Sequence, residues 1–180
     1  MNFIPRHPVE TALSATPSAA GVNHLSVPRS RALWSVLAHK GHEAAVGDAL
    51  LAIDGVSPRF CGPQEWLAVA AGEDAGRVAN ALSAIAGASI AEQSGGRTVL
   101  TLSGPDVRTL LAKCTAVDLH PSAFAVGRSA NALVCHVGGN VARLSADTYE
   151  LIVMRSFALS VFEELRLMGR EFALTASFAD

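Results

Sequence analysis

The stretch RTVLTLSGPDVRTLL, residues 97–111, contains the sharpest change of pattern in the chain. Its first six residues alternate between two faces, which predicts a β-strand. A helix start follows, because Ser103 or Gly104 can act as a cap, Pro105 fits the first turn, and Asp106 complements the positive end of a helix. The stretch therefore predicts a strand followed directly by a helix.

The same pair of elements occurs earlier, where a predicted strand at 32–40 ends at Gly41 and a helix begins near Glu43. Two further strand–helix pairs also correspond, one at 66–70 and the helix after it, the other at 148–154 and the helix after it. This order of elements is that of a split βαβ, or ferredoxin-like, unit. We therefore predict an α+β fold of two packed ferredoxin-like halves with mostly antiparallel sheets, residues 32–93 and 94–180, forming one compact unit.

Other regions have weaker patterns. Residues 1–31 are predicted to be an N-terminal arm, either disordered or lying across a neighbouring surface, because prolines interrupt it and no period persists. Residues 60–64 are predicted to be a turn. A hairpin is predicted between residues 131 and 144, turning at Gly138-Gly139-Asn140, which suits positive φ angles, with His136 partly buried in its first strand.

Composition limits the possible functions. Half of the 180 residues are hydrophobic and 17% are charged, against roughly 25% in ordinary soluble proteins. Such a chain is expected to expose apolar surface, which favours a partner protein that covers it. The net charge of −2 comes without a basic stripe, so nucleic-acid binding is not expected. No apolar run reaches the roughly 18 residues of a membrane span, and no secretory signal is recognised, so we expect a cytoplasmic protein without a membrane segment.

Motifs for chemistry are few. Cys61, Cys114 and Cys135 are odd in number and far apart, so free thiols are predicted rather than a disulfide framework or a zinc site. His39 and His42 have no third ligand nearby, so no metal site is predicted. Neither a GxGxxG nor a GxxxxGK[ST] motif is present, and no catalytic triad or Cys-His pair is recognisable. We therefore predict no catalytic, cofactor-binding or metal-ligating residue in this chain.

Three residues remain as candidate contacts with a ligand or partner: Arg97, His120 and Arg155. The two arginines flank predicted strands, where each could bind a carboxylate of a ligand or partner, or pair with a surface acid of the chain. His120 lies in the sequence Asp118-Leu119-His120-Pro121. Asp118 either orients the His120 ring, as acid–base chemistry would need, or makes a local hydrogen bond that fixes the turn.

Several motifs, in the same order along the chain, resemble the gamma subunits of heterotetrameric sarcosine oxidase. They are Gly62-Pro63-Gln64-Glu65-Trp66-Leu67, Arg97 to Leu100 with Ser103-Gly104-Pro105, Leu111-Ala112-Lys113-Cys114, Asp118 to Pro121 with Phe124, Tyr149-Glu150-Leu151, and Arg155-Ser156-Phe157-Ala158. The resemblance covers about residues 60–175. Two departures are the missing glycine before Cys114 and the missing proline before Arg155.

The resemblance implies a fold similar to that of the folate-binding T-protein of the glycine cleavage system. It also implies a place in a four-subunit enzyme that oxidatively demethylates sarcosine to glycine and passes the one-carbon unit to tetrahydrofolate. The alpha, beta and delta subunits would hold FAD, FMN, NAD and zinc. The gamma chain would hold no cofactor and act in assembly or structural support.

Two alternatives stay open. One is a stand-alone folate-binding one-carbon transfer or accessory protein, which would need an acid for the pterin and a cation, such as Arg97 or Arg155, for the glutamate tail. The other is a homo-oligomeric domain without a ligand, in which an isolated chain self-associates through the surface meant for its partners.

Overall fold

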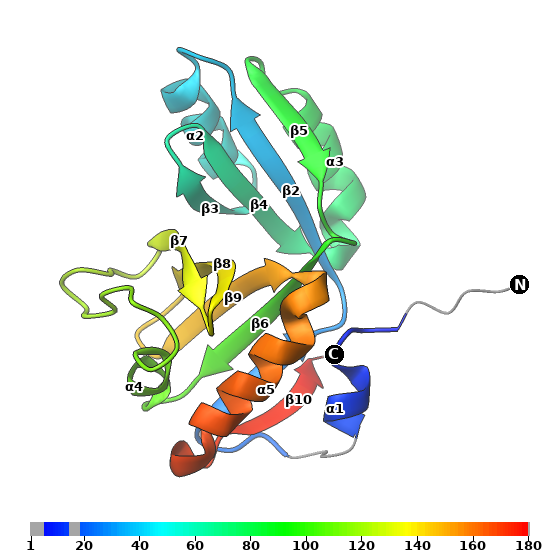
Figure 1. Cartoon of the computed structure of the whole chain (residues 1–180). Coiled ribbons are helices and arrows are strands. Elements are labelled where there is room, and N and C mark those ends of the chain that lie inside the picture. Colours follow the sequence, from blue (N-terminus) through cyan, green and yellow to red (C-terminus); the bar gives the residue numbers. More distant parts are fainter. Residues whose placement is uncertain (1–5, 15–18, 180) are drawn as a thin grey trace, which may run out of the picture.

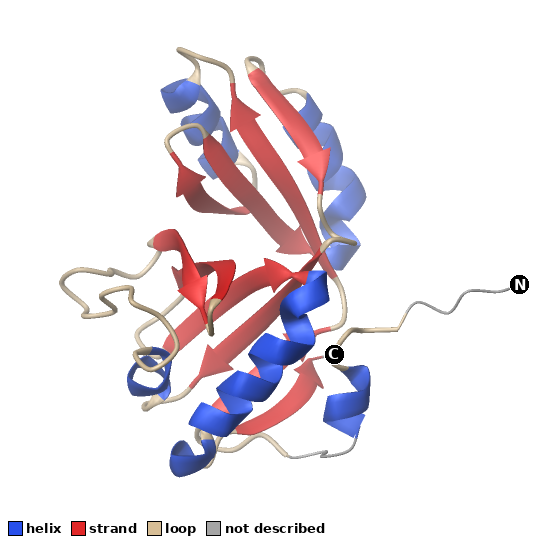
Figure 2. Cartoon of the chain, in the orientation of Figure 1, coloured by secondary structure: helices blue, strands red, loops and turns tan. Residues whose placement is uncertain are grey.

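The first half of the molecule is a four-stranded antiparallel sheet backed by two helices. A computed structural model describes residues 6–14 and 19–179 (Figure 1). The sheet order is β3-β4-β2-β5, and α2 and α3 lie together behind the sheet (Figure 2). This is the strand order of a ferredoxin-like unit. The elements are β2 (Arg31–Ala38), α2 (Glu43–Ala52), β3 (Ser57–Gly62), β4 (Glu65–Ala71), α3 (Ala75–Ser83) and β5 (Ala88–Glu92).

The second half repeats this plan with two additional strands. Its sheet order is β10-β1-β6-β9-β8-β7, with α5 in front of it in the view of Figure 2. The additions are β7 at one edge and β1 (His24–Pro28), which is inserted between β10 and β6 and runs parallel to β10. The other elements are β6 (Arg97–Ser103), α4 (Val107–Leu111), β7 (Ser129–Val134), β8 (Val137–Arg143), β9 (Thr148–Met154), α5 (Ala158–Met168) and β10 (Thr175–Ala179). The predicted α+β class with ferredoxin-like, mostly antiparallel sheets is confirmed.

The N-terminal segment differs from the predicted arm. It contains α1 (Glu10–Ser14) and the inner strand β1, and Leu25 and Val27 are fully buried in the core of the second half. Five strand residues with two inward apolar side chains are too short for a recognisable alternation. Pro28 also argues against a strand in the sequence pattern, although a proline is tolerated at a strand end. The prediction was wrong because distant strands, rather than local pattern, hold this segment.

The turn between β6 and α4 also depends on the N-terminal segment. Gly104 has a φ of +134°, and a Cβ there would lie 2.4 Å from the carbonyl oxygen of Val22. Asp106, rather than Ser103 or Gly104, is the N-cap residue. Its backbone N–H donates to Asn23 Oδ1 at 3.1 Å, and Asn23 Nδ2 donates back to the Asp106 carboxylate at 2.9 Å. Asn23 therefore fixes the strand–helix turn from a distant part of the sequence.

The hairpin of the second half turns three residues earlier than predicted. Cys135 and His136 form the turn, with φ angles of 48° and 66°, and His136 is exposed. The Gly138-Gly139-Asn140 sequence lies within β8. A Cβ on Gly139 would lie 3.0 Å from the Ile152 carbonyl oxygen, so the glycine allows close approach of β9 rather than a turn.

The predicted turn at 60–64 overlaps the strand β3, whose pairing with β4 shifts register between Phe60 and Gly62. Pro58 and Gly62-Pro63 favoured a turn over a strand in the sequence pattern. The strand forms nonetheless, because prolines and irregular pairing are common at a sheet edge.

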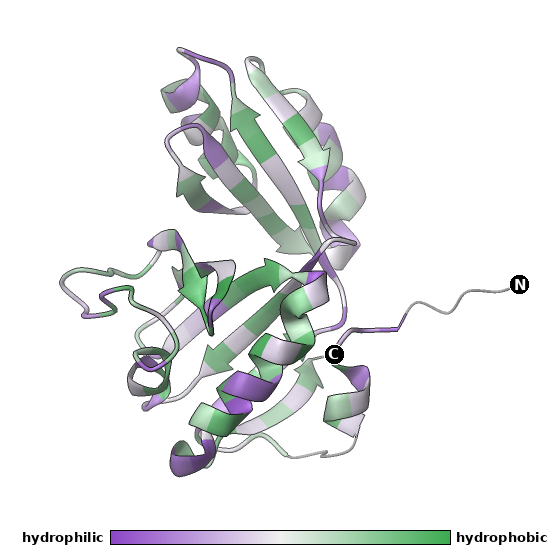
Figure 3. Ribbon diagram, in the orientation of Figure 1, coloured by the Kyte–Doolittle hydropathy of each residue, from purple (hydrophilic) through white to green (hydrophobic). Residues whose placement is uncertain are grey.

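The core has three parts. A large cluster fills the second half and a smaller one lies between α2, α3 and the first sheet. The third joins the two sheets, with Leu33, Leu67 and Val69 from the first half meeting Val99 and Ile152 from the second. Figure 3 shows apolar residues along the strands of both sheets, and polar bands on α5. No helix in the described part of the chain is long and apolar enough to cross a membrane.

Candidate functional site

A buried ion pair joins the two halves beside the third apolar cluster. Arg59 on β3 and Glu150 on β9 are 5% and 3% exposed. The Arg59 Nη2 and Nε atoms donate to Glu150 Oε1 at 2.7 and 3.2 Å. Arg59 Nη1 also donates to the Ser57 hydroxyl. Because each charge is satisfied by the other half, this pair fixes how the sheets meet.

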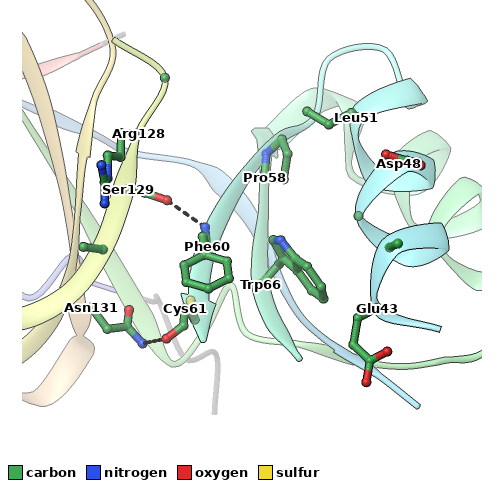
Figure 4. Close-up of a pocket in the computed structure, with 14 residues that line it drawn as sticks. Glu43, Asp48, Leu51, Pro58, Phe60, Cys61, Trp66, Arg128, Ser129 and Asn131 are labelled. Atoms are coloured by element: carbon green, nitrogen blue, oxygen red, sulfur yellow. Dashed lines mark hydrogen bonds between the residues drawn. The ribbon is translucent and has the colours of Figure 1, made fainter. Parts of the chain in front are cut away.

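Polar side chains of β7 and β8 complete the contact with the edge strand β3. The Phe60 N–H donates to Ser129 Oγ at 2.7 Å, and Asn131 Nδ2 donates to the Cys61 carbonyl oxygen at 3.0 Å (Figure 4). The buried Asn140 donates through Nδ2 to the Phe60 carbonyl oxygen at 3.1 Å. Side chains of one half therefore satisfy the exposed backbone of an edge strand in the other half.

A groove of about 690 Å³ lies beside this contact, between α2, β3 and β4 of the first half and residues 127–131 of the second (Figure 4). Phe60 and Trp66 lie against each other in its wall, with ring centroids 6.4 Å apart, and Leu51 is 72% exposed at its rim. Asp48 lies on the α2 side and Arg128 on the opposite side. Apolar walls with opposite charges at the rim suit the docking of a protein segment.

Two of the three candidate residues, Arg97 and Arg155, lie in one pocket of about 270 Å³ together with Arg29, Arg31 and His7. We call this the arginine pocket. It lies where the chain crosses between the halves twice, through the 28–31 connection from β1 to β2 and the 93–96 connection from β5 to β6 (Figure 1). The side chains that line it include four guanidinium groups and no carboxylate among the described residues.

The electrostatics of the arginine pocket are those of a cationic site. Partial burial lowers the pKa of His7, and the charges of Arg155 and Arg29 lower it further, while Glu10 acts in the opposite direction. Arg97 Nε and the Thr98 hydroxyl are both buried and have no hydrogen-bond partner within the described structure. Arg155 donates to the Arg6 carbonyl oxygen, which ties the N-terminal segment to the pocket.

His120 lies elsewhere, in the loop between α4 and β7. Its backbone N–H donates to the Asp118 carboxylate at 2.9 Å, so Asp118 contacts the backbone and not the ring. The ring Nδ1 lies 2.7 Å from the Ser122 hydroxyl. These are the local hydrogen bonds of a turn.

The cysteines are closer than their separation in sequence indicates. All three are free, but the Cys135 N–H donates to the Cys114 carbonyl oxygen at 2.8 Å. A hydrogen bond between the two thiols lowers the pKa of Cys114 and raises that of Cys135. Burial raises the pKa of Cys61. Among the described residues, no three His, Cys, Asp or Glu side chains gather as a metal site would require.

Sequence reasoning missed the residues that act between the halves, Arg59, Glu150 and Asn140, and the two arginines of the 28–31 connection. The closely spaced Arg29 and Arg31 were a usable signal, but they fell inside the predicted arm. The ion pair left no signal, because its members are 91 residues apart.

The fold and these inter-sheet contacts define an α+β protein of two ferredoxin-like units joined face to face. Two solved structures share this arrangement. A chain of heterotetrameric sarcosine oxidase from Corynebacterium sp. U-96, in complex with pyrrole 2-carboxylate, matches with a TM-score of 0.78 and 22% identity over 97% of this chain and 99% of that chain. The glycine cleavage system aminomethyltransferase T from Bartonella henselae matches with a TM-score of 0.67 and 14% identity, over 94% of this chain and 58% of that chain.

The chain belongs to the sarcosine oxidase gamma subunit family, whose model matches residues 30–167. Sarcosine oxidase subunit gamma of Arthrobacter sp. is 37% identical over 86 residues, 47% of this chain and 42% of that protein. The gamma subunit of Corynebacterium sp. strain U-96 is 28% identical over 120 residues, 65% of this chain and 58% of that protein. The matches thus span about half the length of these relatives. The resemblance predicted from the ordered motifs is confirmed, as is the T-protein-like fold.

Proposed function

We propose that the chain is the gamma subunit of a heterotetrameric sarcosine oxidase and supports its assembly without a catalytic residue of its own. The observation that carries this proposal is the structural match to a chain of such an enzyme, which covers 97% of this chain and 99% of the other. The match extends beyond the family region into the N-terminal segment. The complex would oxidatively demethylate sarcosine to glycine in the cytoplasm and transfer the one-carbon unit to tetrahydrofolate. Its alpha, beta and delta subunits would hold FAD, FMN, NAD and zinc.

The groove supports a role in assembly. Leu51 on α2 and Phe60 on β3 line the groove and are 72% and 48% exposed, and Leu133, further along β7, is 63% exposed. A partner that covers these side chains removes apolar surface from water, which favours association by about 25 cal/mol per Å² of apolar area. We assign the groove to an apolar segment of another oxidase subunit.

The test is expression of the tagged chain with the three other subunits, followed by purification, identification of the bound proteins, and assay of sarcosine-dependent peroxide formation. Recovery of the partners with bound flavin and this activity is the expected result. A chain that emerges alone and without flavin would contradict the proposal. Direct titration with tetrahydrofolate would then test the stand-alone folate-binding alternative.

Two leucine variants test the groove separately. Leu51→Glu should reduce recovery of the partners, because it places a charge on the groove rim. Leu167→Glu changes a half-exposed leucine on α5, outside the groove, and should leave recovery unchanged. If both variants recover the partners equally well, the groove is not part of the interface, but the chain can still be the gamma subunit.

A further inference from the structure

The arginine pocket concentrates positive charge from three separate parts of the chain. Arg29 and Arg31 come from the 28–31 connection, Arg97 from the start of β6, and Arg155 from the residue that follows β9. We propose that this pocket is a binding site for a small oxyanion of the phosphate or carboxylate type. Neither membership of the gamma subunit family nor the assembly role requires such a site.

The charges of the pocket favour an anion. Guanidinium groups remain charged at any working pH, so four of them in one pocket create a positive potential that attracts an anion. The described ion pairs of the chain occupy Arg59, Arg77 and Lys113, and none involves an arginine of the pocket. An oxyanion would replace repulsion with attraction, and the planar guanidinium matches the two oxygens of a carboxylate or phosphate.

A buried donor of the pocket is a second observation. Arg97 Nε is buried and has no hydrogen-bond partner in the described structure. Buried polar atoms are nearly always hydrogen-bonded, so an unpartnered one commonly indicates an ion or a water molecule. Arg97 lines the pocket, and its guanidinium can donate to an acceptor-only ligand. The hydroxyl of the neighbouring Thr98 is also buried and unpartnered, but consecutive side chains of a strand point to opposite faces, so it is not part of the site.

The size of the pocket limits the ligand. Its volume of about 270 Å³ is below the roughly 300–1,000 Å³ of pockets that enclose drug-sized molecules. A nucleotide or a folate would not fit within it, whereas one phosphate or small carboxylate with a few waters would. We therefore assign a free small oxyanion rather than a cofactor.

The position of the pocket between the two halves predicts that a bound anion stabilises the fold. Both connections between the halves contribute to the pocket, through Arg29 and Arg31 on one side and Ser94 and Gly95 on the other. An anion held there would contact both crossovers at once. Because it binds only when the halves are correctly placed, it would stabilise the folded chain in proportion to its concentration.

The test is calorimetric titration of the full chain with inorganic phosphate in a low-salt buffer free of other oxyanions. We expect saturable binding that Arg97→Gln weakens by about tenfold, the effect of losing one hydrogen-bonded charge. Arg108→Gln is the matched control, because it removes the same charge from an exposed position on α4 and should change binding by no more than about twofold. Arg97→Lys should weaken binding as well, since lysine keeps the charge but lacks the planar guanidinium that binds two oxygens at once.

A second readout follows His7 by NMR. Bound phosphate should raise the pKa of His7 by offsetting the charges of Arg155 and Arg29, while the ring signals of the distant His120 should not move. If Arg97→Gln does not fold, as judged by circular dichroism, the exposed Arg155→Gln replaces it. Absence of saturable binding, or equal loss in Arg108→Gln, would overturn the proposal. The proposal would also be overturned if the chain does not bind phosphate and Arg97→Gln loses its partner subunits, because the arginines would then bind a carboxylate of a partner.

Discussion

Arginine side chains act at both ends of the junction between the halves, but their environments are opposite. Arg59 is 5% exposed and its guanidinium faces the Glu150 carboxylate of the other half at 2.7 Å. The arginine pocket holds four guanidinium groups, and its described lining includes no carboxylate. The first site is complete within the chain. The second is only partly satisfied, because Arg155 donates to the Arg6 carbonyl oxygen and Arg29 lies over the Phe178 ring, but no carboxylate of the described lining balances its charge. The same residue type thus serves architecture at one end and recognition at the other.

The difference follows from the cost of burial. Removing a charge from water is unfavourable by several kcal/mol, so a deeply buried arginine persists only with a partner. Arg29, Arg31 and Arg155 are exposed, so water screens them and the chain folds without an internal anion. Substitutions at the two sites should therefore affect different properties.

The largest effect is expected at the buried pair. Arg59→Leu leaves Glu150 buried without its counter-charge and should lower the free energy of unfolding by about 3–5 kcal/mol. Urea denaturation measures this loss, with the exposed Arg108→Leu as a control that should change stability by no more than about 0.5 kcal/mol. The double variant Arg59→Leu/Glu150→Leu should recover most of the loss. A single variant as stable as the control would show that the pair does not hold the halves together.

The neutral contact at the same end should matter less. Asn140→Ala removes the donor to the Phe60 carbonyl oxygen and should cost about 1–2 kcal/mol by the same measurement. Asn131→Ala removes the donor to the neighbouring Cys61 carbonyl oxygen and the Oδ1 atom that accepts from Asn140 Nδ2 at 2.9 Å, but from an exposed position where water can replace both groups. If Asn131→Ala costs as much as Asn140→Ala, burial does not explain the strength of this contact.

The sequence predicts those parts of each half whose pattern lies within a short stretch of chain, and misses those held by distant segments. The pattern at 97–111 predicts the β6–α4 unit because alternation, proline and acid follow one another within fifteen residues. The insertion of β1 was not predictable in this way, because residues 24–28 are held by strands more than seventy residues away. Arg97 and Arg155 were recognised separately, but nothing local shows that they share a pocket with Arg29 and Arg31. The sequence therefore predicted two of the four arginines and not the site.

The arginine pocket should tolerate loss of a charge. Arg97→Gln relieves repulsion among the remaining guanidinium groups, so we expect its stability to stay within about 0.5 kcal/mol of the unmodified chain in a buffer without phosphate. Phosphate should then stabilise the unmodified chain more than the variant. A loss comparable to that of Arg59→Leu would instead give Arg97 an architectural role and remove the contrast between the two ends.

The smallest effect concerns His7. Because its folded pKa lies below the unfolded value of 6.5, the unfolded chain binds the proton more readily, and this contribution to stability is present above pH 6.5 and is lost as the pH falls below it. Arg155→Gln should raise the pKa of His7 in an NMR titration and weaken that pH dependence, whereas Arg155→Lys, which keeps the charge, should not. His24 is the internal reference, since burial alone lowers its pKa and the Arg155 substitutions should leave it unmoved. Equal shifts of both histidines would point to a general loosening of the fold, because a change confined to the charge of the pocket can reach only His7.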